Sequence, residues 1–94
     1  MIPGFFLFLS KYTKALFAVH TVRWGDLVDY VRLGKLARAR RKELKLTQES
    51  VAEKMDISVA FYGHIERGTR VLSVETLCRL CVALGLSADY LMGI

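Results

Sequence analysis

The sequence is poor in the residues from which small proteins build covalent, metal-binding or catalytic sites. It has only two cysteines among 94 residues, too few for a disulfide scaffold and without the further ligands that a zinc site needs. His64 and Glu66 are close in sequence, but no serine or cysteine stands beside them as a nucleophile with a supporting base. A chain of this length also buries only a modest core, which argues against a deep pocket. We therefore expect no enzyme, no cofactor and no bound metal.

Acidic residues are scarce relative to basic ones. Nine Asp and Glu residues stand against 14 Lys and Arg, which gives a formal net charge of +5. This balance favours a polyanionic partner, either nucleic acid or an acidic membrane surface. The low cysteine count fits a reducing, cytoplasmic setting.

The sequence also lacks an uninterrupted apolar run. Residues 1–32 are rich in apolar and aromatic side chains, including FFLFL and ALFAV, but Lys11 and Lys14 interrupt them. A membrane-spanning helix needs about 20 apolar residues, and a signal peptide needs positive charge before its apolar run. Neither label fits. We divide the chain into an N-terminal apolar segment, 1–32, and a folded domain, 33–94.

From Leu33 onward, charged and apolar residues alternate with helical period, and no strand pattern competes. Polar residues suited to N-caps and glycines suited to helix ends divide this part into five helices, so the fold class is all-α. The predicted caps are Thr47, Ser58, Ser73 and Ser87, and the predicted stops are Gly68 and Gly85. The apolar stripes are predicted to be Leu33, Leu36, Ala37 and Leu44, then Val51, Ala52 and Met55, and then Val74, Leu77, Leu80, Cys81 and Leu84.

Two of these helices are short and are joined by a tight break at Asp56 and Ile57. This is the layout of a helix-turn-helix unit inside a basic all-helical domain. The stretches LTQESVAEKMDISVAFYGHIERGTR and SVETLCRLCVALGLSADYLMG resemble the phage-repressor-like (xenobiotic-response-element) family of bacterial helix-turn-helix regulators. The resemblance covers roughly residues 33–93 and implies a compact five-helix, lambda-repressor-like DNA-binding domain.

The resemblance also implies roles for particular residues. The helix Ser58–Arg67 would enter the major groove of double-stranded DNA by its N-terminal end. The residues expected to face the groove are Ser58, Val59, Ala60, Gly63, His64 and Arg67. Gln48, Thr69 and Arg70 would meet phosphates, and Arg67 could do so as an alternative to facing the groove. Arg41 would pair with Glu66 to tie the first helix to the end of the recognition helix.

Some of these residues have plainer interpretations. Gly63 could be a tolerated small residue and His64 an uninvolved surface histidine. Most basic residues of the first helix, Arg41 excepted, are expected to form a solvated face. Val59 and Ala60 lack the long polar side chains that pair with bases, so direct readout is expected to be thin and DNA shape to contribute. Cys78 and Cys81 are expected to pack in the core, with a redox sensor as the alternative.

The N-terminal segment has two interpretations. Read from Val28, the chain begins VDYVRLGKLARARR, much like the opening of a family member. Residues before that point would then be upstream sequence translated in error rather than part of the native chain. Alternatively, they form an amphipathic arm that lies on a membrane or pairs with another subunit.

The sequence therefore predicts a sequence-specific transcriptional regulator of repressor type. A homodimer is expected, because one recognition helix buries too little surface for tight specific binding. By resemblance, the C-terminal helices around Ser87–Ile94 would form its interface. The alternatives are a protein-interaction or antitoxin-type module that uses the same fold, and a membrane-tethered regulator.

Overall fold

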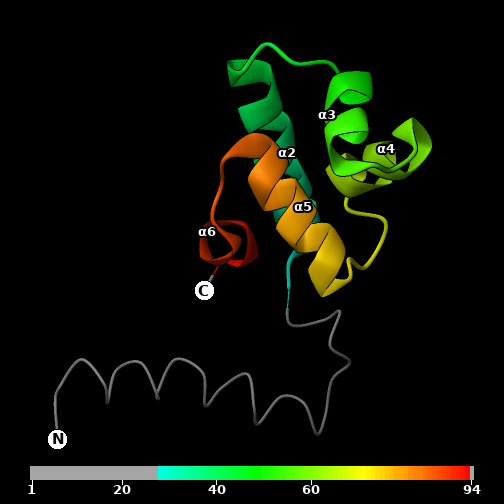
Figure 1. The fold of residues 1–94 in the computed structure, drawn as a ribbon. Coiled ribbons are helices and arrows are strands. Elements are labelled where there is room, and N and C mark those ends of the chain that lie inside the picture. Colours follow the sequence, from blue (N-terminus) through cyan, green and yellow to red (C-terminus); the bar gives the residue numbers. More distant parts are fainter. Residues whose placement is uncertain (1–27, 94) are drawn as a thin grey trace, which may run out of the picture.

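The computed structural model of the chain describes residues 28–93, which form helices joined by short connections. Most of the predicted N-terminal segment, and Ile94, lie outside the described residues, so the predictions made for them stay predictions. No strand occurs within the described range, and the predicted all-α class is confirmed (Figure 1). The helices are α2 (Tyr30–Glu43), α3 (Gln48–Met55), α4 (Val59–Arg67), α5 (Val74–Leu84) and α6 (Ala88–Met92).

Each helix begins at a polar N-cap whose side chain accepts a hydrogen bond from the backbone N–H three residues later. The four predicted caps are confirmed, and Asp29 is a fifth. Asp29 accepts from the N–H of Arg32 at 3.0 Å, so α2 begins at Tyr30, three residues before the predicted start. Asp56, in the break between α3 and α4, adopts the left-handed conformation with φ 56°. Caps and breaks are therefore set by local sequence.

The helix α2 lies at the centre of the domain. It contacts α4, α5 and α6, and α3 packs between α4 and α5. Figure 1 shows α3 and α4 on one side of the α2–α5 pair and α6 on the other. The buried apolar core contains Leu33, Ala37, Val51, Ala52, Met55, Tyr62, Ile65, Leu80, Leu84 and Leu91.

A glycine allows α2 and α4 to cross closely. A Cβ placed on Gly34 would lie inside the van der Waals distance of the backbone carbonyl oxygens of Ile65 and Glu66. Gly68, at the end of α4, has φ 72° and lies against the backbone of Val31. Any larger side chain at Gly34 would push the two helices apart. The role of Gly34 went unnoticed in the sequence because a lone glycine in a helix has no periodic signal.

Three arginines bind the C-terminal ends of helices. Arg32 donates to the carbonyl oxygen of Tyr90 in α6 at 3.2 Å. Arg40 donates to that of Leu84 in α5 at 3.0 Å, and Arg79 to that of Met55 in α3 at 3.0 Å. The last carbonyl groups of a helix lack hydrogen-bond partners within the helix, and they form the negative end of its dipole. A guanidinium therefore stabilises them both by donating hydrogen bonds and by its positive charge. For Arg40, the interpretation as part of a solvated face is therefore wrong.

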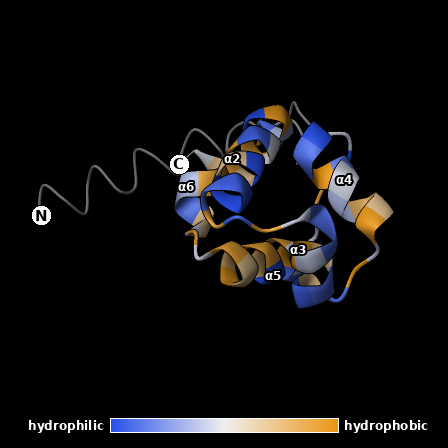
Figure 2. Ribbon diagram, turned by 90° about the horizontal axis from the view of Figure 1, so that it is seen from above, coloured by the Kyte–Doolittle hydropathy of each residue, from blue (hydrophilic) through white to orange (hydrophobic). Residues whose placement is uncertain are grey.

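Two residues of α5 face away from the core, contrary to the sequence interpretation. Val74 is 78% exposed and Cys78 is also exposed. Leu80 and Leu84 are fully buried and define the inner face. At 3.6 residues per turn, Val74 and Cys78 lie progressively farther round the helix from that face. The predicted apolar stripe of α5 was therefore too wide, because it included Val74 and Cys78. Figure 2 shows that much of α5 is coloured as hydrophobic.

Candidate nucleic-acid interface

The helices α3 and α4 form a compact pair joined by the turn at Asp56. Val51, Ala52 and Met55 on α3 are buried, as are Tyr62 and Ile65 on α4. Ala52 is only 1% exposed, and its small side chain lets the two helices cross closely. The pair is therefore a helix-turn-helix unit in which α4 is the second helix.

The N-terminal end of α4 faces solvent. Ser58, Val59 and Ala60 are all exposed. The Ser58 hydroxyl accepts a hydrogen bond from the N–H of Phe61 at 3.0 Å and can still donate its own proton. This end can approach a groove without any side chain having to leave the core.

The C-terminal end of α4 is held by an ion pair. Arg41 Nε lies 2.6 Å from Glu66 Oε2, and Arg41 Nη2 donates to Glu66 Oε1 at 3.2 Å. The Glu66 side chain is 4% exposed and that of Arg41 13%. Arg41 also donates to the carbonyl oxygen of Leu46 at 3.0 Å. This bidentate arrangement fixes the orientation of α4 against α2.

Gln48 joins the same cluster. Its side-chain nitrogen donates to Glu66 Oε1 at 2.9 Å. The family resemblance implied that Gln48 contacts a phosphate of DNA. That role stays a prediction, and the structure adds an internal partner that sequence reasoning missed. No sequence signal marked this partner, because many side chains and backbone N–H groups can donate to a carboxylate.

The cluster changes the acid–base properties of its members. Burial pushes the pKa of Glu66 upward, but hydrogen bonds from Arg41 and Gln48 outweigh it and hold the pKa below its ordinary value. Burial raises the pKa of Tyr62, and the neighbouring Glu66 carboxylate raises it further. Within the described residues, the Tyr62 hydroxyl has no hydrogen bond of standard geometry. Glu66 is therefore ionised at neutral pH, and Tyr62 stays neutral.

Gly63 lies beneath the side chain of Arg67. The residue is buried, and a Cβ placed on it would meet Arg67 Nη1 at 3.1 Å. The absence of a side chain at Gly63 lets the guanidinium of Arg67 lie against the helix backbone. The prediction that Gly63 itself faces the groove remains open, with Arg67 as the outer surface at this point.

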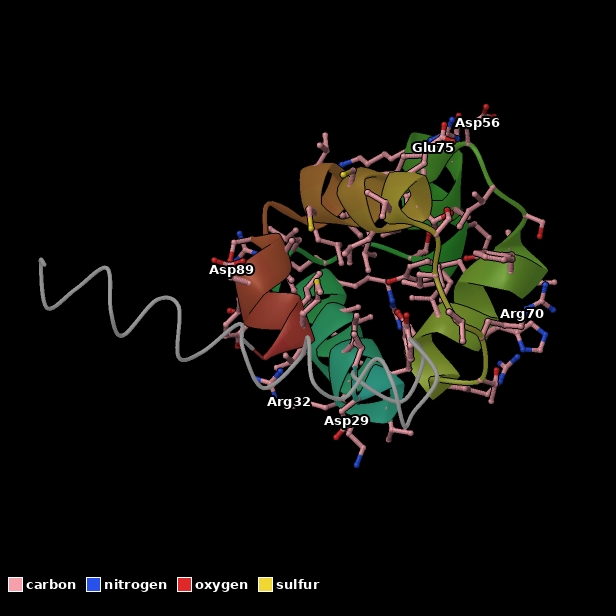
Figure 3. The ribbon with its side chains drawn as sticks, turned by 90° about the horizontal axis from the view of Figure 1, so that it is seen from below. Asp29, Arg32, Asp56, Arg70, Glu75 and Asp89 are labelled. Atoms are coloured by element: carbon pink, nitrogen blue, oxygen red, sulfur yellow. The ribbon has the colours of Figure 1, made fainter. Side chains whose placement is uncertain are left out.

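Thr69 and Arg70, which follow α4, contact side chains of that helix. His64 Nδ1 and Thr69 Oγ1 are 2.7 Å apart, and the guanidinium carbon of Arg70 lies 5.5 Å from the centre of the Phe61 ring. Figure 3 shows Arg70 at the outer edge of α4, far from the labelled Asp29 and Asp89. Thr69 and Arg70 are exposed, and Arg67 is exposed on the same stretch. Basic and polar side chains thus form an exposed rim at and after the C-terminal end of α4.

Comparison with known proteins agrees with this geometry. Residues 38–91 match the family model described as helix-turn-helix. The chain is 34% identical over 64 residues to the control protein C.MunI of Mycoplasma sp, covering 67% of this chain and 86% of the relative. It is 38% identical over 61 residues to the immunity repressor protein of Bacillus phage phi105, covering 65% of this chain and 42% of that protein.

A solved structure shows the same fold. The restriction-modification controller protein C.AhdI from Aeromonas hydrophila has a TM-score of 0.63 and 30% sequence identity, covering 67% of this chain and 96% of that one. The chain belongs to the helix-turn-helix family. It is a DNA-binding transcriptional regulator, a role that is not enzymatic.

In this regulator, no helix within residues 28–93 combines the length and the apolar character that crossing a membrane requires. The same residues hold no cluster of three or more His, Cys, Asp or Glu side chains arranged to bind a metal ion.

Burial raises the pKa of the Cys81 thiol, which lowers its thiolate fraction.

Proposed function

We propose that this regulator recognises its operator by placing the N-terminal end of α4 in the major groove. The observation that carries the proposal is the contrast along α4. Ser58, Val59 and Ala60 are exposed at one end, whereas Glu66 is buried in an ion pair at the other. A helix held at its far end presents a fixed geometry to the bases.

The readout at this end is chemically limited. Val59 and Ala60 offer methyl groups, which suit the methyl group of thymine, and Ser58 offers a hydroxyl that suits several bases. His64 is half-buried beside Thr69 and can reach a base or a phosphate. Sequence-dependent DNA shape supplies the remaining selectivity.

Phosphate contacts come from the rim. Arg67, Thr69 and Arg70 are exposed beyond the groove-facing residues, and Gln48 lies at the N-terminal end of α3. The N-terminus of α3 carries a positive dipole end that favours a phosphate. These contacts set affinity and position, and carry no base sequence directly.

The regulator acts as a cytoplasmic homodimer on two half-sites and represses by occupying the operator. One recognition helix buries less surface than specific complexes need, and a two-fold dimer doubles it. The similarity to a phage immunity repressor supports repression.

The decisive experiment compares base preferences. Sequences bound by the parent protein are selected from random DNA, and affinities for the selected operator and its single-base variants are then measured at one fixed salt concentration. Ala60→Gln should change which base is preferred at one position, because a bidentate glutamine–adenine contact contributes about 1 to 3 kcal/mol of discrimination. The matched control is Ala39→Gln, which makes the same change at an exposed position of α2. If Ala60→Gln leaves the base preference unchanged, the N-terminal end of α4 does not lie in the major groove.

A second variant tests how closely α4 approaches DNA. Gly63→Leu should displace the Arg67 guanidinium and thicken the helix on that side, so it should weaken binding to operator and random DNA alike. Its circular dichroism spectrum should match that of the parent. Unaltered DNA affinity would favour the rival in which this face docks a protein. That rival also predicts a weak dependence on salt, whereas DNA binding weakens steeply as salt rises.

A further inference from the structure

An apolar groove lies at the end of the domain where the described part of the chain begins. It has a volume of about 320 Å³ and lies between the start of α2, residues 71–73, the start of α5 and the end of α6. Figure 1 shows these parts gathered at one end of the domain. The side chains that line the groove include Val28, Leu33, Leu77 and Met92.

The walls of the groove favour an apolar occupant. Val74 is 78% exposed and Val71 is 66% exposed, the highest values among large hydrophobic residues of the described range after Val82. Ser73 also lines the groove, but its hydroxyl donates to Thr76 Oγ1 at 2.9 Å and accepts from the Thr76 N–H at 3.1 Å. An apolar side chain that enters the groove would therefore be stabilised by leaving water.

The chain itself leads apolar side chains to this groove. Val28 is the first described residue and lines the groove, and 27 residues precede it. The last four of these are Trp24, Gly25, Asp26 and Leu27. Four residues span at most about 14 Å when fully extended, so the Trp24 ring is tethered close to the groove. Glycine and aspartate are both turn residues, so the chain can fold back at 25–26.

Trp24 matches the groove in size and in chemistry. A tryptophan is among the side chains that bury the most apolar area, and a volume near 300 Å³ is at the lower end for ligand pockets, with room for one large ring. Because the ring is tethered by a short segment, its effective concentration at the groove is in the mM range. A second copy of the chain or a lipid would have to compete with it from solution.

We infer that Trp24 docks in this groove of its own chain, with Leu27 packed at the edge, so that residues 24–27 cover the apolar end of the domain. The docked segment would join the start of α2 to α5 and α6. This inference concerns a different surface from the proposed DNA contacts and does not depend on them. It also differs from both sequence interpretations of the residues before Val28, which place them outside the native chain, or on a membrane or another subunit.

The test uses the fluorescence of the full chain, which has a single tryptophan. A docked indole should emit at a shorter wavelength than tryptophan in water and should be protected from quenching by acrylamide. Val74→Asp places a charge in the groove wall, so it should shift the emission of Trp24 to longer wavelength and increase its quenching.

The matched control is Val82→Asp, which makes the same change at an 84% exposed valine of α5 that does not line the groove. It should emit like the parent. Both variants should keep the circular dichroism spectrum of the parent, because neither valine belongs to the buried core. At Val74, which is the first residue of α5, an aspartate also suits the positive end of the helix dipole.

Unfolding gives a second, independent measurement. Trp24→Ala should lower the urea concentration at the midpoint of unfolding, followed by circular dichroism, because the groove loses its occupant. Phe8→Ala removes an aromatic ring from the same N-terminal segment, but far from Val28 in the sequence, and should unfold like the parent. A midpoint that Trp24→Ala leaves unchanged would overturn the inference.

The outcomes separate the possible occupants. A parent whose Trp24 emits as in water overturns the inference, and a shift that then appears only with phosphatidylglycerol vesicles assigns the segment to a membrane. Emission that moves to longer wavelength on dilution assigns the groove to a second copy. Equal emission in Val74→Asp and Val82→Asp places Trp24 elsewhere. Short-wavelength emission that is independent of concentration and lost in Val74→Asp alone supports the inference.

Discussion

The two ends of α4 are built in opposite ways. At its C-terminal end, Glu66 is 4% exposed, is bound by Arg41 and Gln48, and lies against Gly34 of α2. At its N-terminal end, Val59 is 39% exposed, and Ser58 and Ala60 are exposed with it. The C-terminal end is held by both α2 and α3, whereas the N-terminal end faces solvent.

The contrast shows how a short helix can be both rigid and variable. A helix of nine residues is too short to be stable alone, so its position depends on tertiary contacts. Those contacts lie at the C-terminal end of α4, away from the end that is proposed to contact bases. Changes at the exposed end can alter specificity without unfolding the domain, whereas changes at the anchored end act on stability first.

The largest effect is expected from Gly34→Ala. The new Cβ would collide with the carbonyl oxygens of Ile65 and Glu66, which are backbone atoms and cannot move alone. We expect a loss of about 3 kcal/mol or more in the free energy of unfolding, at the upper end for overpacked cores. Urea denaturation followed by circular dichroism measures it. A variant as stable as the parent would show that the close crossing is not required.

The control for Gly34→Ala is Gly63→Ala. The new Cβ there would meet only the end of the flexible Arg67 side chain, at 3.1 Å. Helix propensity favours alanine over glycine by about 1 kcal/mol, so this variant should be as stable as the parent or slightly more stable. Equal losses in both variants would mean that any glycine replacement harms the helices, independent of their crossing.

A smaller effect is expected from breaking the ion pair. Arg41→Ala leaves a buried carboxylate with Gln48 as its remaining side-chain donor, and should cost about 1 to 3 kcal/mol. Glu66→Ala should cost less within that range, because Arg41 keeps its bond to Leu46. A double-mutant cycle measures the coupling, and strictly additive losses would contradict the pair.

The same pair predicts a dependence of stability on pH. The pKa of Glu66 is lowered from its ordinary value of 4.5 in the folded protein. Its contribution to stability is therefore complete above about that pH and is lost as pH falls through the lowered pKa. Glu66→Gln should remove this contribution, so the difference in stability between parent and variant should shrink below pH 4. A difference that stays constant with pH would assign the stabilisation to packing instead.

The smallest effect on stability is expected from Gln48→Ala. Removing one hydrogen bond to a buried carboxylate should cost about 1 kcal/mol. If Gln48 also contacts a phosphate, affinity should fall equally for operator and random DNA. Measuring unfolding and binding on the same preparation separates the two roles. Reduced stability with unaltered DNA affinity would leave Gln48 with its internal role alone.

Much of the fold was predictable because its signals are local. N-caps at Thr47, Ser58, Ser73 and Ser87 act on amides three residues away, and Gly68 ends a helix through its own backbone conformation. The buried positions of α3 followed from helical period alone. Asp29 was not predicted as a cap because it lies within the apolar N-terminal segment, before the helical pattern that begins at Leu33.

The site was predictable only in outline. The resemblance placed Arg41 beside Glu66 and α4 at the surface. It did not show that Gln48 turns inward to the same carboxylate, or that Arg67 covers Gly63. These arrangements depend on side-chain directions, which sequence spacing leaves open when two acceptors lie within reach.

By itself, the sequence determined where helices begin and end and which helix-turn-helix unit they form, since capping and periodicity operate within one turn. Only the tertiary structure decided which surfaces meet. Gly34 is required by the close crossing of α2 and α4. Arg32, Arg40 and Arg79 bind the C-terminal ends of neighbouring helices. The packing of α5 leaves Val74 and Cys78 exposed to solvent. Each depends on the angle and distance between helices far apart in the chain, and no local pattern specifies these.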